Sequence, residues 1–372
     1  MLGPILLGVA IALAQAVAAE EGEGSMSVER FAVSRDDAIH ECFPSLCRTR
    51  TGRLILAYRE SDEHQPRQFT RLIARHSDDG GATWSERQVL VATSTDEPDT
   101  LFKYNCPKVQ QLEDGRVLYL CDAFINDLSK PPAERFVSAR IVFWFSEDDG
   151  ASWSEPVQTS VNGVMPDEIV ELNDGSWLLA THLQNASPHC LVQYVSRSSD
   201  GGATWEPAVV VAKREGYDFC EASILECGDG FLVCYMRENR GLGRPVYKCF
   251  SSDGGRTWDG PYETLMDCGY RPVAHFTRGG DILILYRHYP GQGVGMRNTF
   301  AYIESEQSAR EKDRAAQRGN ILPLDHDRHA HPDTGYTGWA ELDDGEFLAV
   351  NYIRDDAPMA QIRGYRFSLS DF

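Results

Sequence analysis

The chain alternates short apolar runs with polar turns, and one such arrangement recurs six times. Each copy has an apolar strand, a turn that is usually Asp-Gly, and a second apolar strand, as in a β-hairpin. The copies span Phe43–Glu60, Cys106–Ala123, Pro166–Leu183, Glu221–Glu238, Arg271–His288 and Tyr336–Ile353. Their turn glycines are 50 to 65 residues apart, which is the length of one four-stranded propeller blade. The pattern predicts an all-β, six-bladed β-propeller over residues 27–372.

A second repeat follows the hairpin in the first four copies. The octets are Ser77–Trp84, Ser146–Trp153, Ser198–Trp205 and Ser251–Trp258. In each, an Asp can accept bonds from the backbone of its own turn, a Gly can take a positive φ, and a Trp re-enters an apolar strand. We expect each octet to join the two outer strands of its blade.

The fifth and sixth copies differ from this scheme. The fifth has no octet, and the charged segment Ser308–Arg318 favours a helical insertion in its place. The sixth copy runs out near the end of the chain, so Ser27–Ser34 is expected to supply its missing outer strand. Closure of the ring by both ends of the chain would remove open sheet edges.

Strand alternation brings two residues of every inner hairpin to one mouth of the ring, nine places before and seven places after the turn Gly. The early positions are Phe43, Cys106, Pro166, Glu221, Arg271 and Tyr336. The late positions are Arg59, Asp122, His182, Arg237, Arg287 and Tyr352. Four arginines beside one Glu and one Tyr predict an anion-binding pocket.

The net charge and the first residues of the chain exclude some classes of partner and predict where the protein is located. The net charge of −20 argues against binding to nucleic acid or to an anionic membrane through the general field. Residues 1–19 combine an apolar run with small residues and predict a cleaved signal peptide, hence a secreted or periplasmic protein. The run is shorter than the roughly 20 residues that a bilayer needs, so no stable membrane insertion is expected. The sequence makes no prediction of oligomeric state.

Cysteine and histidine leave two questions open. Ten cysteines in an exported chain allow disulfides, but no C-x-x-C pair occurs and several lie inside apolar runs. Buried free thiols and one or two bridges are therefore both possible. His326, His329 and His331 have the alternation of metal ligands. We favour a polar loop for these three histidines and expect no metal or other cofactor.

The octets resemble the Asp box of the sialidase superfamily, in which the box is structural and lies away from the active site. The stretch GYTGWAELDDGEFLAVNY resembles the nucleophile strand of exo-sialidases, which implies Tyr336 as nucleophile. EASILECGDGFLVCYMREN is similar to the strand that carries the partner Glu and a carboxylate-binding Arg, here Glu221 and Arg237. GMRNTFAYI implies Arg297 as a further carboxylate-binding residue. The resemblance covers essentially the whole predicted propeller.

The chain departs from the family pattern in the first copy. Sialidases typically begin their first blade with Arg-Ile-Pro, whereas this chain has Cys-Phe-Pro, starting at Cys42. The first carboxylate-binding Arg of the family is therefore absent. Arg59, Arg271 or Arg287 could replace it. The family's acid/base Asp lies in the loop after the second strand, where we select Asp62 over Glu63 and His64. His64 is also a candidate substrate contact.

The resemblance implies a retaining hydrolase that releases terminal sialic acid from glycoconjugates. Arginines would bind the substrate carboxylate, and a neutral phenol would attack the anomeric carbon without repelling it. Glu221 would accept the phenol's proton, while Asp62 would protonate the leaving oxygen and later activate water. Two alternatives stay open: an exo-glycosidase of the same fold acting on a uronic or neutral sugar, and a non-catalytic carbohydrate-binding propeller.

Overall fold

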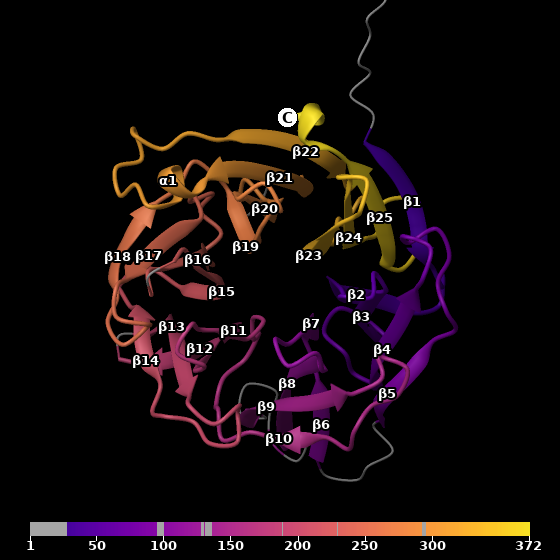
Figure 1. The fold of residues 1–372 in the computed structure, drawn as a ribbon. Coiled ribbons are helices and arrows are strands. Elements are labelled where there is room, and N and C mark those ends of the chain that lie inside the picture. The colour runs from indigo at the N-terminus through magenta and orange to yellow at the C-terminus, as the bar shows by residue number, and fades with distance from the viewer. Residues whose placement is uncertain are drawn as a thin grey trace, which may run out of the picture.

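Six antiparallel sheets stand around a common axis (Figure 1). This computed structural model describes residues 28–94, 100–127, 130, 136–187, 189–228, 230–291 and 295–372. The predicted signal peptide, residues 1–19, lies outside the described residues. The arrangement confirms the all-β, six-bladed propeller that the repeats predict. Among the described residues, no helix has the length and apolar character needed to cross a bilayer.

The first three blades follow chain order from the axis outward. Blade one contains β2 (His40–Arg48), β3 (Leu54–Ser61), β4 (Phe69–Ser77) and β5 (Gln88–Ser94). Blade two contains β6 (Thr100–Tyr104), β7 (Lys108–Gln111), β8 (Val117–Asp127), β9 (Phe136–Ser146) and β10 (Val157–Gln158). Blade three contains β11 (Val170–Glu171), β12 (Trp177–Ala186), β13 (His189–Ser198) and β14 (Val209–Ala212). In blade two, β6 and β7 both pair with β8, as two parts of one interrupted inner strand.

The next two blades repeat this order, and the last is completed from the N-terminal side. Blade four contains β15 (Phe219–Glu226), β16 (Leu232–Glu238), β17 (Tyr247–Ser251) and β18 (Asp259–Glu263). Blade five contains β19 (Gly269–Phe276), β20 (Asp281–His288), β21 (Asn298–Ser305) and β22 (Asn320–His326). Blade six contains β23 (Thr334–Glu341), β24 (Phe347–Ile353), β25 (Gln361–Phe367) and β1 (Glu29–Ser34).

Strand β1 closes the ring as its outermost strand. It pairs antiparallel with β25, and Phe31 lies opposite Gly364. A Cβ atom at Gly364 would come within 2.5 Å of the Phe31 ring, so this position needs glycine for the two strands to pack. The closure predicted for Ser27–Ser34 is confirmed over the described part of that segment.

The octets occupy the hairpins between outer strands, as predicted. In the first, Ser77 Oγ accepts the amide N–H of Gly81 at 2.8 Å, and Asp79 accepts both the amide (2.9 Å) and the hydroxyl (2.6 Å) of Thr83. The hydroxyl and amide bonds lower the pKa of Asp79 to about 2. Because the chain reverses at every strand, the octets lie at the end opposite the predicted mouth. The octet side chains make their hydrogen bonds within the turn itself, which indicates a structural role.

The predicted helical insertion of blade five is mostly irregular. It lies between β21 and β22 as expected, but its helix, α1 (Glu306–Ala309), has only four residues. The buried ammonium of Lys248 donates to the carbonyl oxygens of Ser308 (3.2 Å) and Ala309 (2.9 Å). These carbonyls are therefore bound by a strand of blade four, and tertiary contacts override the helix propensity of the sequence.

All ten cysteines lie in described residues, and all are free thiols. Eight of them are buried. Burial raises the pKa of Cys106 to about 12, so this thiol stays protonated and unreactive at neutral pH. The alternative of one or two disulfides is contradicted, and the cysteines act as small apolar core residues.

Candidate active site

One backbone feature recurs on the inner strand of four blades. The pairing of the inner strand shifts by one residue near its start, and a residue other than glycine there has a positive φ. These residues are Phe43 (57°), Glu221 (51°), Arg271 (49°) and Tyr336 (54°). Positive φ is unfavourable for such residues, and a bulge of this kind re-aims the side chain that it carries. All four are early positions of the repeat, so the strain falls where the sequence predicts the mouth.

Tyr336, Glu221 and Arg237 form the centre of the site. The Tyr336 hydroxyl donates to Glu221 Oε1 at 2.6 Å, across 115 residues of sequence. Arg237 Nη1 donates to both oxygens of the same carboxylate, at 2.8 and 2.7 Å. Tyr336 is only 6% exposed and Glu221 only 4%. The structure therefore brings together, with little solvent, the three residues that the resemblance selects from blades four and six.

The charge states of this pair follow from its surroundings. Burial alone would raise the pKa of Glu221, but the charges of Arg237 and Arg271 overcome it and lower the pKa to about 2. Burial and the Glu221 charge raise the pKa of Tyr336 well above its usual value. The resting site thus holds a neutral phenol that donates to an ionised carboxylate, which is a strong charge-assisted hydrogen bond.

Two arginines of blade five lie beside the phenol ring. The guanidinium carbons of Arg271 and Arg287 are 5.6 and 6.0 Å from the centre of the Tyr336 ring. Arg271 donates to the carbonyl oxygens of Pro166 and Ala222. Arg287 donates to the carbonyl of Thr334, and within the described residues it forms no ion pair. Positive charge therefore lies beside the phenol ring, and among the described residues only Arg271 of these two arginines is near a carboxylate other than Glu221, that of Asp167 at 3.9 Å.

Blade one contributes the apolar ring of Phe43 and a buried arginine, Arg59. The Phe43 ring lies 4.6 Å from that of Tyr336, centre to centre, and Cys42 is fully buried behind it. The Arg59 guanidinium carbon lies 4.5 Å from the centre of the Phe43 ring. Arg59 donates to Asn105 Oδ1 (2.6 Å) and to the carbonyl of His64 (2.7 Å). A buried arginine therefore does lie next to the position where the first copy lacks one.

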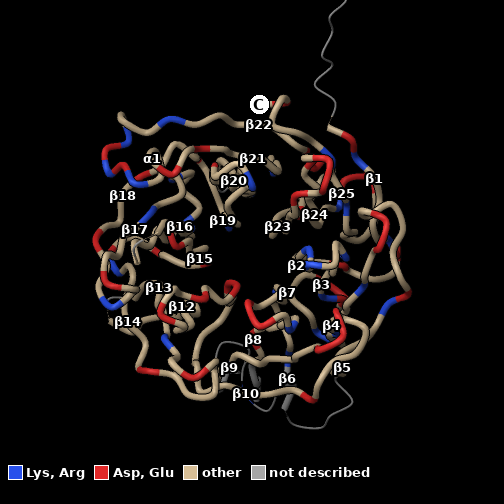
Figure 2. Tube along the Cα trace, in the orientation of Figure 1, with Lys and Arg blue, Asp and Glu red and all other residues tan. Residues whose placement is uncertain are grey.

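Four of these guanidinium groups keep an unused donor. The Nε atoms of Arg59, Arg237, Arg271 and Arg287 are buried and have no hydrogen-bond partner in the described chain. Elsewhere acidic residues are spread around the whole ring (Figure 2). A buried N–H donor without a partner is unfavourable.

Asp333 contacts two further candidate residues, Arg297 and His64, and the sequence analysis did not predict it. Its Oδ1 lies 3.3 Å from Arg297 Nη1 and accepts the Tyr352 hydroxyl at 3.1 Å. Its Oδ2 lies 3.0 Å from His64 Nδ1. Burial would raise the pKa of Asp333, but the hydrogen bond with His64 and the nearby cations hold it far below its usual range. The only sequence signal was its place three residues before Tyr336, in a stretch considered only for its histidines.

The Asp62 carboxylate is bound within its own loop, and no hydrogen bond joins it to Tyr336 or Glu221 in the described residues. Its carboxylate accepts backbone N–H groups from Arg67 (3.1 Å), Gln68 (3.1 Å) and Phe69 (3.4 Å), within its own loop. Partial burial would raise the pKa of Asp62, but these amide bonds lower it. A general acid needs the opposite shift, so the geometry favours a loop-forming role.

We expect Asp62→Asn to retain turnover within about tenfold, since a factor of ten corresponds to about 1.4 kcal/mol. The measurement is hydrolysis of a sialoside whose leaving group is itself a sugar, because such a group needs a proton to leave. A loss of about 100-fold or more, as for a general acid, would restore the assignment of Asp62.

Each of the three histidines in the stretch before Tyr336 takes part in a hydrogen bond with a neighbouring residue. His326 Nδ1 lies 2.6 Å from Asn298 Oδ1, and His329 Nδ1 accepts the amide of His331 at 2.9 Å. In the described residues they are not part of any group of side chains arranged to bind a metal ion. His329 and His331 lie in a polar loop, as predicted, whereas His326 is the last residue of β22.

The fold and this site define a six-bladed propeller of the sialidase type. The family model described as "BNR repeat-like domain" matches residues 130–310. A protein named "Sialidase" from Bacteroides fragilis (strain YCH46) is 28% identical over 146 residues, which are 35% of this chain and 24% of that protein. The chain thus matches about a quarter of this relative's length.

Solved structures agree on the fold. A protein of unknown function from Dyadobacter fermentans DSM 18053 matches with a TM-score of 0.74 and 22% identity, over 91% of this chain and 98% of that one. Hadza microbial sialidase Hz136 matches with a TM-score of 0.64 and 20% identity, over 92% of this chain and 68% of that one. The structure has the sialidase fold, and the comparisons together support the sialidase superfamily.

Proposed function

We propose that this protein is an exported, retaining exo-glycoside hydrolase that releases terminal sialic acid from glycoconjugates, with Tyr336 as nucleophile. The observation that carries the proposal is the 2.6 Å hydrogen bond from the Tyr336 hydroxyl to the ionised Glu221. The sialidase fold and the similarity to a sialidase support the same class of reaction.

The buried arginines favour an anionic sugar. Arg59 and Arg287 are 1% and 6% exposed, and neither forms an ion pair with a carboxylate in the part of the chain that the structure describes. Burying a charge without a partner is costly. A substrate carboxylate bound beside Arg287 would give this cation the partner that it lacks, which is a reason for an acidic protein to retain it.

The chemistry follows from the charge states of the pair. The Tyr336 oxygen would attack the anomeric carbon as its proton passes to Glu221, forming a tyrosyl–sugar bond while the glycosidic C–O bond breaks. The leaving oxygen would take a proton from water. Because the phenol is neutral at rest, it does not repel the substrate carboxylate. Arg271 and Arg287 lie against the ring and would stabilise the negative charge that develops on its oxygen. The hydroxide that remains would then attack the same carbon and release the sugar, and the departing Tyr336 oxygen would take its proton back from Glu221.

Arg287→Met is expected to weaken the binding of a carboxylated ligand by about 2 to 5 kcal/mol, as for loss of one partner of a buried charge pair. The unliganded protein should be as stable as wild type or more so, because the variant removes an unpaired buried charge. Binding is measured with a sialic acid analogue, and stability is measured by thermal unfolding.

The control is the same pair of proteins with a carboxylate-reduced analogue, for which the Arg287 effect should disappear. An equal effect on both ligands would contradict recognition of the carboxylate. It would favour the second candidate, a neutral-sugar glycosidase, for which the apolar ring of Phe43 beside Tyr336 is the specific support.

A further inference from the structure

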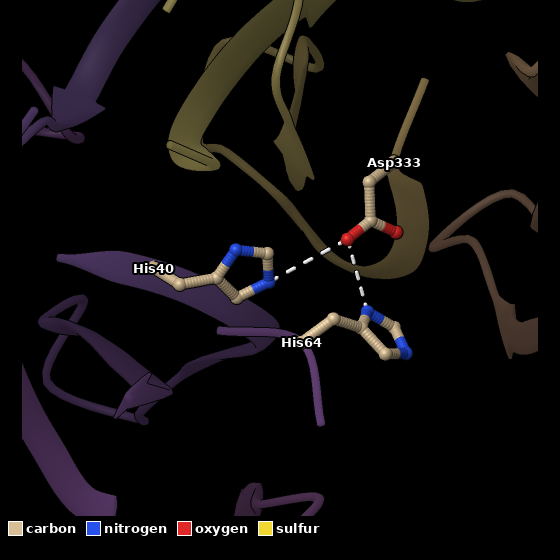
Figure 3. Close-up of side chains that lie close together, drawn as sticks. All are labelled: His40, His64 and Asp333. Atoms are coloured by element: carbon tan, nitrogen blue, oxygen red, sulfur yellow. Dashed lines mark hydrogen bonds and ion pairs between the residues drawn. The ribbon is translucent and has the colours of Figure 1, made fainter. Parts of the chain in front are cut away.

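Two histidines and a carboxylate from three distant segments converge at the edge of the Tyr336 site. His40 Nε2 and His64 Nδ1 both face Asp333 Oδ2, at 3.5 and 3.0 Å (Figure 3). All three potential ligand atoms lie within 4.8 Å of one another. His40 begins β2, His64 lies in the loop after β3, and Asp333 immediately precedes β23, so the fold rather than local sequence assembles the group.

The separations are close to those of a coordinated ion. A tetrahedral zinc ion lies about 2.0 to 2.2 Å from nitrogen and oxygen ligands, which places two ligand atoms about 3.4 Å apart. The separations of His40 Nε2 and His64 Nδ1 from Asp333 Oδ2, 3.5 and 3.0 Å, lie on either side of that value, and the two histidine nitrogens lie within 4.8 Å of each other. The side chain of His64 is 37% exposed, so its ring can shift by the small amount needed to complete the arrangement.

His40 gives the second, independent indication. It is only 4% exposed, and its buried Nε2 makes no hydrogen bond in the described residues although it points to the carboxylate. A buried and unpartnered imidazole nitrogen beside a carboxylate is suited to binding a metal ion.

The surroundings both support and limit such a site. The second oxygen of Asp333 accepts from Tyr352 and faces Arg297, which fixes the carboxylate as outer-shell partners of metal ligands do. The charges of Arg59 and Arg354 act on His40 as well. These cations oppose a bound divalent ion, so we expect weaker binding than at a structural zinc site.

We infer that His40, His64 and Asp333 bind one divalent transition-metal ion, with zinc the best-suited probe. Two imidazoles and one carboxylate are a ligand set of zinc and iron(II) proteins that leaves a coordination position open. His64 is the exposed member, and its ring lies 5.5 Å from Phe43, which contacts Tyr336. The three residues therefore lie at the rim of the candidate active site, where a bound ion would be close to water or to a sugar oxygen.

The test is calorimetric titration of the chelator-treated, dialysed protein with zinc chloride at pH 7.5. We expect one saturable site per chain, and a visible absorption band typical of tetrahedral coordination when cobalt(II) is used instead. His64→Ala should weaken binding by more than about 100-fold, beyond the loss of an outer-shell partner. Because His64 is partly exposed, this variant is expected to fold.

His331→Ala is the matched control, because it removes a histidine of the polar loop and should leave zinc binding unchanged. His40→Gln, checked for folding by circular dichroism, should lose binding as His64→Ala does. The absence of a saturable site in wild type would overturn the inference, and so would wild-type affinity in His64→Ala. No arm of the experiment measures turnover, so its failure would leave the proposed function standing.

Discussion

Tyr336→Phe is expected to fold normally and to hydrolyse a fluorogenic aryl sialoside at least about 1,000 times more slowly than wild type. The change removes only the oxygen that bonds Glu221 at 2.6 Å. It keeps the ring that packs against Phe43 and Tyr352. An aryl leaving group departs with little help from an acid, so the assay reports the nucleophile alone. Binding of a sialic acid analogue should remain within about tenfold of wild type, since the hydroxyl that is removed donates to Glu221 and the arginines that would bind the carboxylate are unchanged.

Tyr352→Phe is the matched control for this prediction. Tyr352 lies on the other inner strand of the same blade, and its ring centre is 6.3 Å from that of Tyr336. Its hydroxyl donates to Asp333 rather than to Glu221. Turnover of the aryl sialoside by Tyr352→Phe should therefore stay within about tenfold of wild type. Equal losses in the two variants would show that packing, and not the nucleophile, is being disturbed.

Glu221→Gln is expected to lower kcat by about 100- to 10,000-fold, the usual contribution of a positioned general base. The amide can still accept a bond from Tyr336, but it does not take up the phenol's proton. Arg237 also loses the carboxylate that it contacts through both oxygens. Leaving a buried charge unpaired should destabilise the fold by about 3 to 5 kcal/mol. The measurements are aryl sialoside turnover and denaturant unfolding.

The pH dependence of stability provides a second check on Glu221. Its folded-state pKa, about 2, lies below the ordinary value of 4.5. The contribution of the carboxylate to stability is therefore fully present above pH 4.5 and is lost as the pH falls toward 2. The Glu221→Gln protein should lack this part of the acid dependence.

Glu238→Gln is the matched control for the Glu221 prediction. Glu238 is a buried carboxylate of the same inner hairpin, and it accepts the amide of Asp218 at 3.0 Å without contact to the phenol. This variant should lose stability but keep turnover close to that of wild type. If Glu221→Gln and Glu238→Gln reduced turnover to the same extent, the base role of Glu221 would be wrong.

The blades and the mouth could be predicted because they depend on local spacing. Hairpin turns, apolar strands and octets each occupy a few consecutive residues, and their repetition specifies the propeller. Strand alternation alone placed Glu221, Arg271 and Tyr336 at one end. The positive φ at these positions was not foreseeable from residue type, because Glu, Arg and Tyr rarely adopt it.

The parts that could not be predicted depend on contacts between distant segments. Asp333 meets His64 across 269 residues of sequence, and no pattern within either segment indicates the other. The helix expected over Ser308–Arg318 is shortened by Lys248, a residue of another blade. Asp62 was selected from a loop by analogy, and the amides that bind it belong to the turn that follows. Loop geometry of this kind is fixed by the folded backbone rather than by spacing.

The most direct test of the central claim is hydrolysis of the fluorogenic aryl sialoside by the purified, folded protein, with Tyr336→Phe measured beside it. The account predicts release of the fluorophore by wild type and almost none by Tyr336→Phe. No release by folded wild-type protein, or equal release by the two, would contradict the assignment of Tyr336 and Glu221 as the catalytic pair of a sialidase.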